Sequence, residues 1–409
     1  MGEYIGMDLH PVLLEKLNAA LSPDTAATFT RRDALLPGVP GKVHAVTGMR
    51  RSGKTIFLGQ LLADRRRTVP AERALYVSFD DERLADMASE DMSRLIEEYY
   101  RRYPELRGRE TVYWFLDEVQ LVKGWERFVR RVIDSERVEV VVSGSSAKML
   151  SREVHTSLRG RGMETVIRPF SFREFLRHRN EEPAKEPRRW TSAERSRVEK
   201  RFIGFLAEGG FPEAQGLDAP LRIELLQGYV NTVLFRDIVE RYGVSQVAAL
   251  RWLVRHCLRN PANAFSANRL YKDLKAQGHA VAKDSVHAFL EYLMDSFLLS
   301  SVPLATDSER QRNSNPRKLY PADPGLIGAF DTSGRANTGH ALETAVLIEI
   351  ERRRADVGYV KTAEGYEVDF LVRYPAGGTE LLQVCADTSN EGTLERELRA
   401  LTAASAGAK

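Results

Sequence analysis

The amino-acid sequence has 409 residues, which exceeds the usual size of one hydrophobic core and predicts two to four domains. Lys and Arg number 60 against 57 Asp and Glu, so a formal charge of only +3 excludes a polycation that coats nucleic acid through composition alone. Two cysteines, Cys257 and Cys385, are too few for a disulfide framework or a four-ligand zinc site, and no run of 18 apolar residues or basic secretory leader is present. We therefore expect a cytoplasmic protein that binds no membrane.

Short apolar strands alternate with helical segments in the first half of the chain. Val12, Leu13, Leu14 and Leu17 predict a helix near the N-terminus, before a lead-in rich in Pro and Gly. Continuous apolar runs predict strands at 42–48, 74–80, 111–117, 138–144 and 163–169, and helical spacing appears at 56–66, 91–103 and 125–136. Such runs are typical of strands buried on both faces of a parallel sheet. The predicted fold class is α/β.

The second half changes character after a charged, Pro-punctuated stretch at 180–190. Residues 191–259 are expected to be helical. Within 245–330 the pattern predicts three helices, at about 246–259, 267–276 and 282–294, and strands near 297–304 and 317–320. The segment 339–401 begins with a predicted helix and continues with strands at 359–362, 367–374 and 380–386.

A glycine-rich loop between the first predicted strand and its helix carries the strongest chemical signal. Its sequence GMRRSGKT fits the pattern in which backbone N–H groups wrap phosphates, a lysine neutralises the β/γ charge and a hydroxyl ligates Mg²⁺. The predicted nucleotide-binding residues are Gly48, Arg50, Arg51, Ser52, Gly53, Lys54 and Thr55.

Two adjacent carboxylates, Asp117 and Glu118, end the predicted strand at 111–117. Such a pair is often a solvated turn. Behind a phosphate loop, however, Asp117 is expected to hold Mg²⁺ together with Thr55, and Glu118 to orient and deprotonate the attacking water. The pairing favours hydrolysis over transfer to another acceptor.

Two further features follow the next strand. Ser143 and Ser145 are candidates to sense the γ-phosphate, although a serine here also suits a helix N-cap. Arg159 and Arg161 lie in a glycine-flanked loop suited to an arginine finger, which supplies positive charge to a phosphoryl transition state, in some proteins that of a neighbouring subunit. Exposed arginines are usually only solvated, and the pattern does not choose between the two.

The order of these motifs resembles one family. GMRRSGKT, FDDERL at 79–84, LDEVQ at 116–120, SGSS at 143–146, LRGRG at 158–162 and PFSFREF at 169–175 are similar to the archaeal and bacterial AAA+ ATPases that carry a winged helix and a restriction-endonuclease-like domain. The resemblance implies a core with strand order 5-1-4-3-2, ATP with Mg²⁺, and a homo-oligomer that shares nucleotide sites, with a hexameric ring favoured. It implies these domains: an N-terminal helix and lead-in at 1–40, the ATPase core at 41–180, a helical lid at 191–244, a winged helix at 245–330 and a nuclease-like domain at 339–409.

The expected winged helix is a candidate DNA-binding surface. Its third helix presents Lys283, Ser285 and His287, and the polar loop that follows is expected to form a basic wing for phosphates, with Arg310, Arg312, Arg317 and Lys318. Winged helices also join proteins together, and a wing of mixed polarity is also an ordinary exposed hairpin.

The nuclease-like domain lacks part of its expected site. Glu343 and Asp369 fill the helix and strand carboxylate positions, but Gln383 stands where another carboxylate would ligate metal and Cys385 where lysine would activate water. Glu367 is expected on the opposite strand face unless the strand is bulged. We therefore expect a nuclease fold without nuclease activity.

The favoured function is an ATP-hydrolysing machine that acts on DNA, in particular structured or branched DNA. The first alternative is a nucleotide-controlled switch that regulates a protein complex with little turnover. The second alternative is an ATP-dependent nuclease.

Overall fold

The computed structural model describes residues 9–22, 29–144, 160–331 and 337–407, and these divide into two compact units, 1–167 and 168–409. The N-terminal helix belongs to the first unit. The lid, winged-helix and nuclease-like segments expected from sequence lie together within the second unit. None of the helices in the described ranges is long and apolar enough to cross a membrane.

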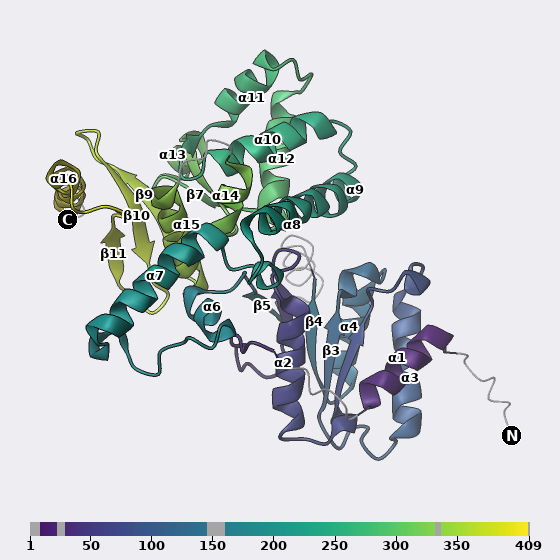
Figure 1. Cartoon of the computed structure of the whole chain (residues 1–409). Coiled ribbons are helices and arrows are strands. Elements are labelled where there is room, and N and C mark those ends of the chain that lie inside the picture. The colour runs from purple at the N-terminus through teal and green to yellow at the C-terminus, as the bar shows by residue number, and fades with distance from the viewer. Residues whose placement is uncertain (1–8, 23–28, 145–159, 332–336, 408–409) are drawn as a thin grey trace, which may run out of the picture. The chain divides into compact units, whose positions relative to one another are not determined.

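The first unit is a three-layer α/β domain around a parallel five-stranded sheet (Figure 1). Its strand order, β2-β3-β4-β1-β5, is the predicted 5-1-4-3-2 order. The strands are β1 Val43–Thr47, β2 Ala74–Ser78, β3 Val112–Asp117, β4 Val138–Ser143 and β5 Gly162–Val166. The α-helices are α1 Pro11–Leu21, α2 Lys54–Arg66, α3 Ser89–Arg102 and α4 Trp125–Ser135.

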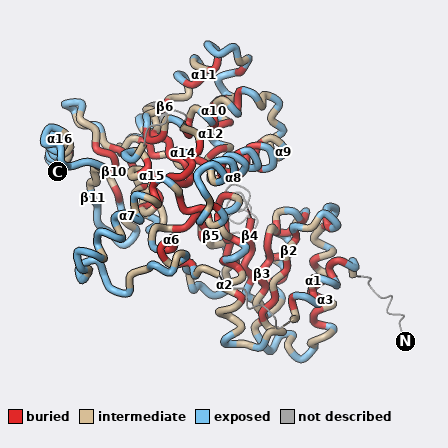
Figure 2. Tube along the Cα trace, viewed as in Figure 1, coloured by how far each residue is buried: buried red, intermediate tan, exposed pale blue. Residues whose placement is uncertain are grey.

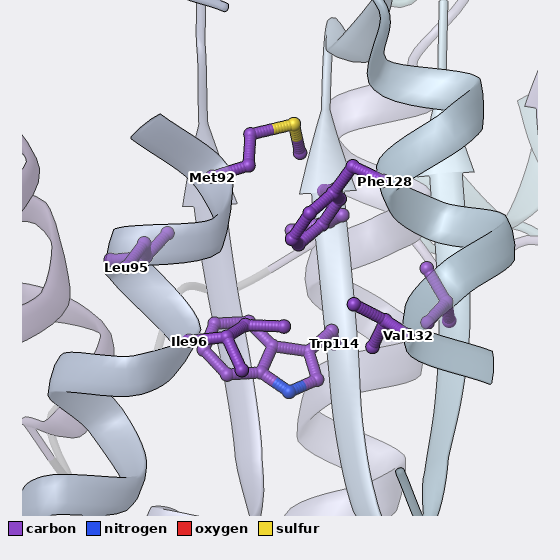
Figure 3. A pocket seen from close by; sticks show the side chains of 8 residues that line it. Met92, Leu95, Ile96, Trp114, Phe128 and Val132 are labelled. Carbon is purple, nitrogen blue, oxygen red and sulfur yellow. The ribbon is translucent and has the colours of Figure 1, made fainter. Parts of the chain in front are cut away.

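Both faces of this sheet are covered, which explains the continuous apolar runs of its strands. Helices α1, α3 and α4 cover one face, and α2 packs with the lead-in residues Ala34 and Leu36 on the other. Strands β1 to β4 are accordingly buried along most of their length, whereas β5 at the edge of the sheet is mostly half-buried (Figure 2). Figure 3 shows side chains of α3 and α4 converging on Trp114 of β3. The cavity between them is only about 10 Å³, so this layer is a packed core and no ligand site.

The second unit begins with helices and continues with two small antiparallel sheets. Its helical part comprises α6 Phe172–His178, α7 Ser192–Glu208, α8 Ala219–Thr232, a π-helix at Val233–Val239 and α9 Glu240–Tyr242. The expected three helices follow as α10 Val247–Arg259, α11 Ala267–Ala276 and α12 Lys283–Asp295. They accompany an antiparallel sheet of order β6-β8-β7, formed by β6 Ala264–Phe265, β7 Leu299–Val302 and β8 Arg317–Pro321.

The polar loop between β7 and β8 contains a short helix, α13 Glu309–Ser314, where a hairpin wing was expected. The side chain of Ser308 accepts a hydrogen bond from the backbone N–H of Gln311, and this N-cap explains why a helix begins here. The chain continues through α14 Gly325–Phe330 and α15 Thr338–Arg352.

The last sheet has the order β11-β10-β9, with β9 Asp356–Lys361, β10 Glu367–Arg373 and β11 Thr379–Leu382, and α16 Glu391–Gly407 follows it. Strand β11 is shorter than predicted and ends before Gln383. Side-chain bonds replace the ladder beyond that point, because Asp369 N–H donates to Gln383 Oε1 and Val384 N–H donates to Asp369 Oδ2.

Candidate nucleotide-binding site

The phosphate loop connects the carboxyl end of β1 to the first turn of α2. Three of its residues have positive φ angles, namely Gly48 at 140°, Arg51 at 67° and Gly53 at 98°. These backbone conformations suit glycine and open the loop toward the start of α2. Ser52 and Lys54 are buried, Arg50 and Gly53 are half-buried, and Arg51 and Thr55 are exposed.

Lys54 binds the carbonyls of its own loop. Its Nζ donates to the carbonyl oxygens of Gly48 at 3.0 Å and Met49 at 3.1 Å. The side chain is 5% exposed, so its charge is held inside the loop rather than dispersed in solvent. The arrangement suits a lysine that turns to phosphate oxygens when nucleotide enters.

Asp117 is the point where several hydroxyl groups meet. It ends β3 and is almost fully buried. Its Oδ2 accepts from Thr55 Oγ1 at 2.8 Å and from Tyr76 Oη at 2.7 Å, and its Oδ1 accepts from the hydroxyl of Ser143. Burial, reinforced by the charge of Asp117, raises the pKa of Tyr76 well above its usual range, so Tyr76 remains a donor. Hydroxyl and carboxylate oxygens are the ligands that Mg²⁺ prefers, and Thr55 and Asp117 fit that ion.

Glu118 follows Asp117 with a left-handed backbone, at φ 53°. Its N–H donates to Ser143 Oγ at 3.1 Å, and its carboxylate accepts from the side-chain amide of Gln120. Ser143 therefore links the last residues of β3 and β4. Gln120 was not among the predicted site residues; the only signal for it is its place two residues after the carboxylate pair.

Arg32 is a second residue that sequence reasoning missed. It is 3% exposed, and its guanidinium donates to the carbonyl oxygen of Ser52 in the phosphate loop at 2.9 Å. Gln60 of α2 fixes this segment by bonding both the N–H and the carbonyl of Arg32. The signal was two adjacent arginines in the lead-in, which give no indication of burial.

Ser145 and Arg159 lie outside the described residues. Arg161 lies directly before β5, where Gly162 pairs with Val43 at the amino end of β1. The phosphate loop follows the carboxyl end of β1. Arg161 and the phosphate loop of the same chain therefore lie at opposite ends of the parallel strands, Arg161 at the amino end and the loop at the carboxyl end. Arg161 forms an exposed ion pair with Asp134 of α4.

The predicted DNA-binding residues are only partly gathered on a surface. Lys283 and His287 are exposed on α12 and Ser285 is half-buried there, whereas Arg310 and Arg312 lie on α13. Arg317 is half-buried at the start of β8. Arg312 lies 3.5 Å from Asp356.

The prediction for Lys318 was wrong. Its side chain is 4% exposed, and it forms ion pairs with Glu343, Glu367 and Asp369 instead of facing solvent. The cause is its place in β8, the central strand of its sheet, which turns the side chain toward α15 and β10.

The predicted position of Glu367 was also wrong. Glu367 and Asp369 both reach Lys318, because alternate residues of a strand share one face. The register irregularity of β10 lies between Val368 and Leu371.

Gln383 and Cys385 do not join this cluster of charges. The amide of Gln383 donates to Glu397 of α16 at 2.6 Å, and Cys385 Sγ bonds the carbonyl of Asp387. Burial raises the pKa of Glu343, which also accepts from Tyr320 Oη at 2.6 Å. Among the described residues no group of three His, Cys, Asp or Glu side chains is arranged to hold a metal ion.

Two known family patterns match parts of this chain. The sequence pattern of a family described as "AAA domain" matches residues 40–176, and that of a "Domain of unknown function (DUF8612)" matches 199–336. An uncharacterized protein of Haemophilus influenzae is 27% identical over 333 residues, 81% of this chain and 79% of that protein.

Solved structures with partial likeness include the Aeropyrum pernix ORC2 protein in its ADP form and the Aeropyrum pernix ORC1 protein in complex with DNA. The first is 14% identical, with 78% of this chain and 90% of that chain covered and a TM-score of 0.34. The second is 16% identical, with coverage of 71% and 87% and a TM-score of 0.28.

A longer match comes from the uncharacterized protein MJ1544 of Methanocaldococcus jannaschii. It is 32% identical over 394 residues, which is 95% of this chain and 83% of that protein. The chain therefore carries an AAA domain and belongs to the same family as MJ1544.

Proposed function

We propose that this chain hydrolyses ATP with Mg²⁺ and uses the reaction to act on DNA, with structured or branched DNA as the favoured substrate. One observation carries the hydrolysis: Lys54, Asp117, Glu118 and Ser143 lie at the carboxyl ends of neighbouring parallel strands, where ligands bind in such sheets. In this proposal Lys54 neutralises the phosphates, Thr55 and Asp117 hold Mg²⁺, and Glu118 activates water.

The action on DNA rests on the second unit. Helices α10, α11 and α12 with the sheet β6-β8-β7 support the proposal of a winged helix, and Lys283, His287 and Arg310 are exposed on it. Such residues suit phosphate contacts, which position a protein on DNA. The loss of Lys318 from this surface makes it less basic than the sequence predicted.

A nucleotide-controlled switch is a second candidate, favoured by one specific contact. The side-chain amide of Gln120 binds the carboxylate of Glu118, which keeps that carboxylate engaged with a neighbour instead of with water. A protein that spends most of its time in this arrangement would hold ATP and hydrolyse it slowly.

The experiment that tests the proposal measures ATP binding and steady-state turnover with linear, supercoiled and branched DNA. We expect Lys54→Ala to abolish binding, and Glu118→Gln to retain binding and lose turnover, because the phosphate loop is kept while the group that orients water is removed. Glu126→Gln, eight residues later in α4, is the matched control and should behave as wild type.

Two results would decide against the favoured function. Wild-type turnover in Glu118→Gln would remove Glu118 as the base. Slow turnover that no form of DNA accelerates, together with faster turnover in Gln120→Ala, would favour the switch.

A further inference from the structure

A buried lysine and three carboxylates lie together where β8 meets the C-terminal sheet. Lys318 Nζ lies 2.9 Å from Glu367 Oε1, 3.0 Å from Asp369 Oδ1 and 3.4 Å from Glu343 Oε1. An ammonium group has three N–H donors, and here each has one carboxylate partner. The cation is therefore fully coordinated by the chain.

Two further donors reach the two deepest carboxylates. Glu343 Oε1, the oxygen that faces Lys318, also accepts from Tyr320 Oη, and Asp369 Oδ2 accepts from the N–H of Val384 at 3.0 Å. These contacts hold the two carboxylates in place around Lys318. Apolar side chains close the site, since Tyr320, Tyr359 and Phe370 belong to one buried cluster.

A divalent metal does not fit this arrangement. The resemblance to nucleases implies a metal between Glu343 and Asp369, at roughly 2.0–2.6 Å from their oxygens. The ammonium nitrogen already lies within 3.4 Å of one oxygen of each. A metal ligated by those oxygens would lie against Lys318, and the two positive charges would repel each other in a site of low dielectric.

We propose that Lys318 is the resident cation of the C-terminal domain: its ammonium takes the position that a divalent metal would need, so the domain binds no metal there and cuts no DNA. The cluster instead works as an ionic clasp that joins the sheet β6-β8-β7 to α15 and β10. Two backbone hydrogen bonds also connect the segment after β7 to β9. Tyr359 N–H donates to the carbonyl of Pro303 at 2.9 Å, and Ala305 N–H donates to the carbonyl of Tyr359 at 2.8 Å. This inference does not depend on the proposed ATPase function.

The test measures how many Mn²⁺ ions the nucleotide-free full chain binds. Free Mn²⁺ is quantified from its electron paramagnetic resonance signal, and the bound ions are the difference from the total. We expect Lys318→Met to bind one more Mn²⁺ per chain than wild type, because it leaves three carboxylates without their cation. Adding Asp369→Asn to that variant should remove the extra ion. The nucleotide site is the same in all variants, so it cancels from the comparison.

Three controls make the result specific. Lys361→Met removes a half-exposed lysine 3.8 Å from Glu367, at the rim of the cluster, and should gain no ion. Lys318→Arg keeps the charge and should also gain none. Asp369→Asn in the otherwise wild-type chain should leave the number of bound Mn²⁺ ions unchanged. This variant shows whether the wild-type cluster holds a metal even where Lys318→Met fails to fold.

A wild-type chain that loses one Mn²⁺ when Asp369 is replaced would overturn the proposal, because the metal site would then be native. A folded Lys318→Met chain that gains no ion would overturn it as well. So would cleavage of supercoiled DNA by the wild-type protein that disappears in Asp369→Ala.

Discussion

Gly48 leaves no room for a side chain at the start of the phosphate loop. A Cβ at this position would lie 2.1 Å from the carbonyl oxygen of Ile167, and the φ of 140° is one that other residues rarely adopt. We expect Gly48→Ala to distort the loop and reduce nucleotide binding at least tenfold, measured with a fluorescent ATP analogue.

Gly59 provides the matched control for this prediction. It lies inside α2, and a Cβ there would meet nothing within 4 Å. Gly59→Ala should keep nucleotide binding and stabilise the helix by about 1 kcal/mol. Wild-type affinity in Gly48→Ala would show that the loop tolerates the contact.

Residues whose partners are close in sequence or fixed by backbone geometry could be predicted. The phosphate loop is of the first kind, because its spacing follows from a strand, a turn and a helix. Asp117 is of the second kind, because the carboxyl ends of neighbouring parallel strands meet at the place where ligands bind in such sheets. Lys318 is not, since a lysine in a polar segment is usually exposed and its partners Glu343 and Asp369 lie 25 and 51 residues further along. Whether the Lys318 ammonium is buried or exposed depends on how β8 packs against α15 and β10, and a sequence pattern does not specify this packing.

At the scale of elements, a buried carboxylate joins the end of α7 to the start of α14. Asp323 is 2% exposed, and its oxygens accept from the N–H groups of Gly210 at 2.7 Å and Gly325 at 2.9 Å. A Cβ on Gly209 would clash with the same carboxylate. Gly209, which caps the end of α7, therefore leaves room for the carboxylate of Asp323.

The pKa of Asp323 predicts a pH dependence of stability. Burial raises this pKa from 3.8 to about 7, although the two backbone donors act in the opposite direction. The folded protein therefore holds this proton more tightly than the unfolded chain does. Its contribution to stability is complete below about pH 4 and is lost as the pH rises to about 7, at no more than about 1.4 kcal/mol per pH unit.

We expect thermal melting between pH 5 and pH 8 to reveal this contribution. The melting temperature of Asp323→Asn should change less steeply with pH than that of wild type, because the titrating group is absent. Asp307→Asn, which alters an exposed carboxylate, is the control. Parallel pH profiles of wild type and Asp323→Asn would contradict the raised pKa.

The basic residues of α12 and α13 lead to a prediction about DNA. The triple change of Lys283, Arg310 and Arg312 to Ala should weaken binding to duplex DNA, because it removes up to three phosphate contacts. Each lost contact should lower the log–log salt slope by about 0.9. Fluorescence anisotropy at several salt concentrations measures the slope, and an unchanged slope would place the binding surface elsewhere.

These elements also show how far the sequence specifies local structure. All five strands of the first sheet could be predicted, and for β1 to β4 the reason is that their apolar runs are buried along most of their length. Helix α13 and the early end of β11 could not, because each depends on one or two side-chain bonds to the backbone. Ser308 provides that bond for α13, and Asp369 and Gln383 provide it beyond β11.

At the scale of the whole molecule, the position of Arg161 bears on assembly. Arg161 lies at the amino ends of the strands, and the phosphate loop of its own chain lies at their carboxyl ends. We therefore propose that any catalytic role of Arg161 is exerted on a neighbouring subunit. Arg159, two residues earlier, lies outside the described residues and remains the other candidate. A finger at Arg161 would make the nucleotide site a composite of two chains, which agrees with the shared nucleotide sites that the resemblance implies.

Mixing two inactive variants tests this composite site. Lys54→Ala subunits keep the arginines and lose the phosphate loop, whereas Arg159→Ala/Arg161→Ala subunits keep the loop and lose the finger. In a random equal mixture, about one interface in four pairs an intact loop with an intact finger, so about a quarter of the wild-type ATPase activity should return. The single arginine variants, mixed in the same way, identify which residue acts.

Wild-type activity per subunit should also rise with protein concentration as subunits meet. Activity that is independent of concentration, with no rescue at any mixing ratio, would show that each chain hydrolyses ATP alone, because a site completed by its neighbour cannot work in isolation.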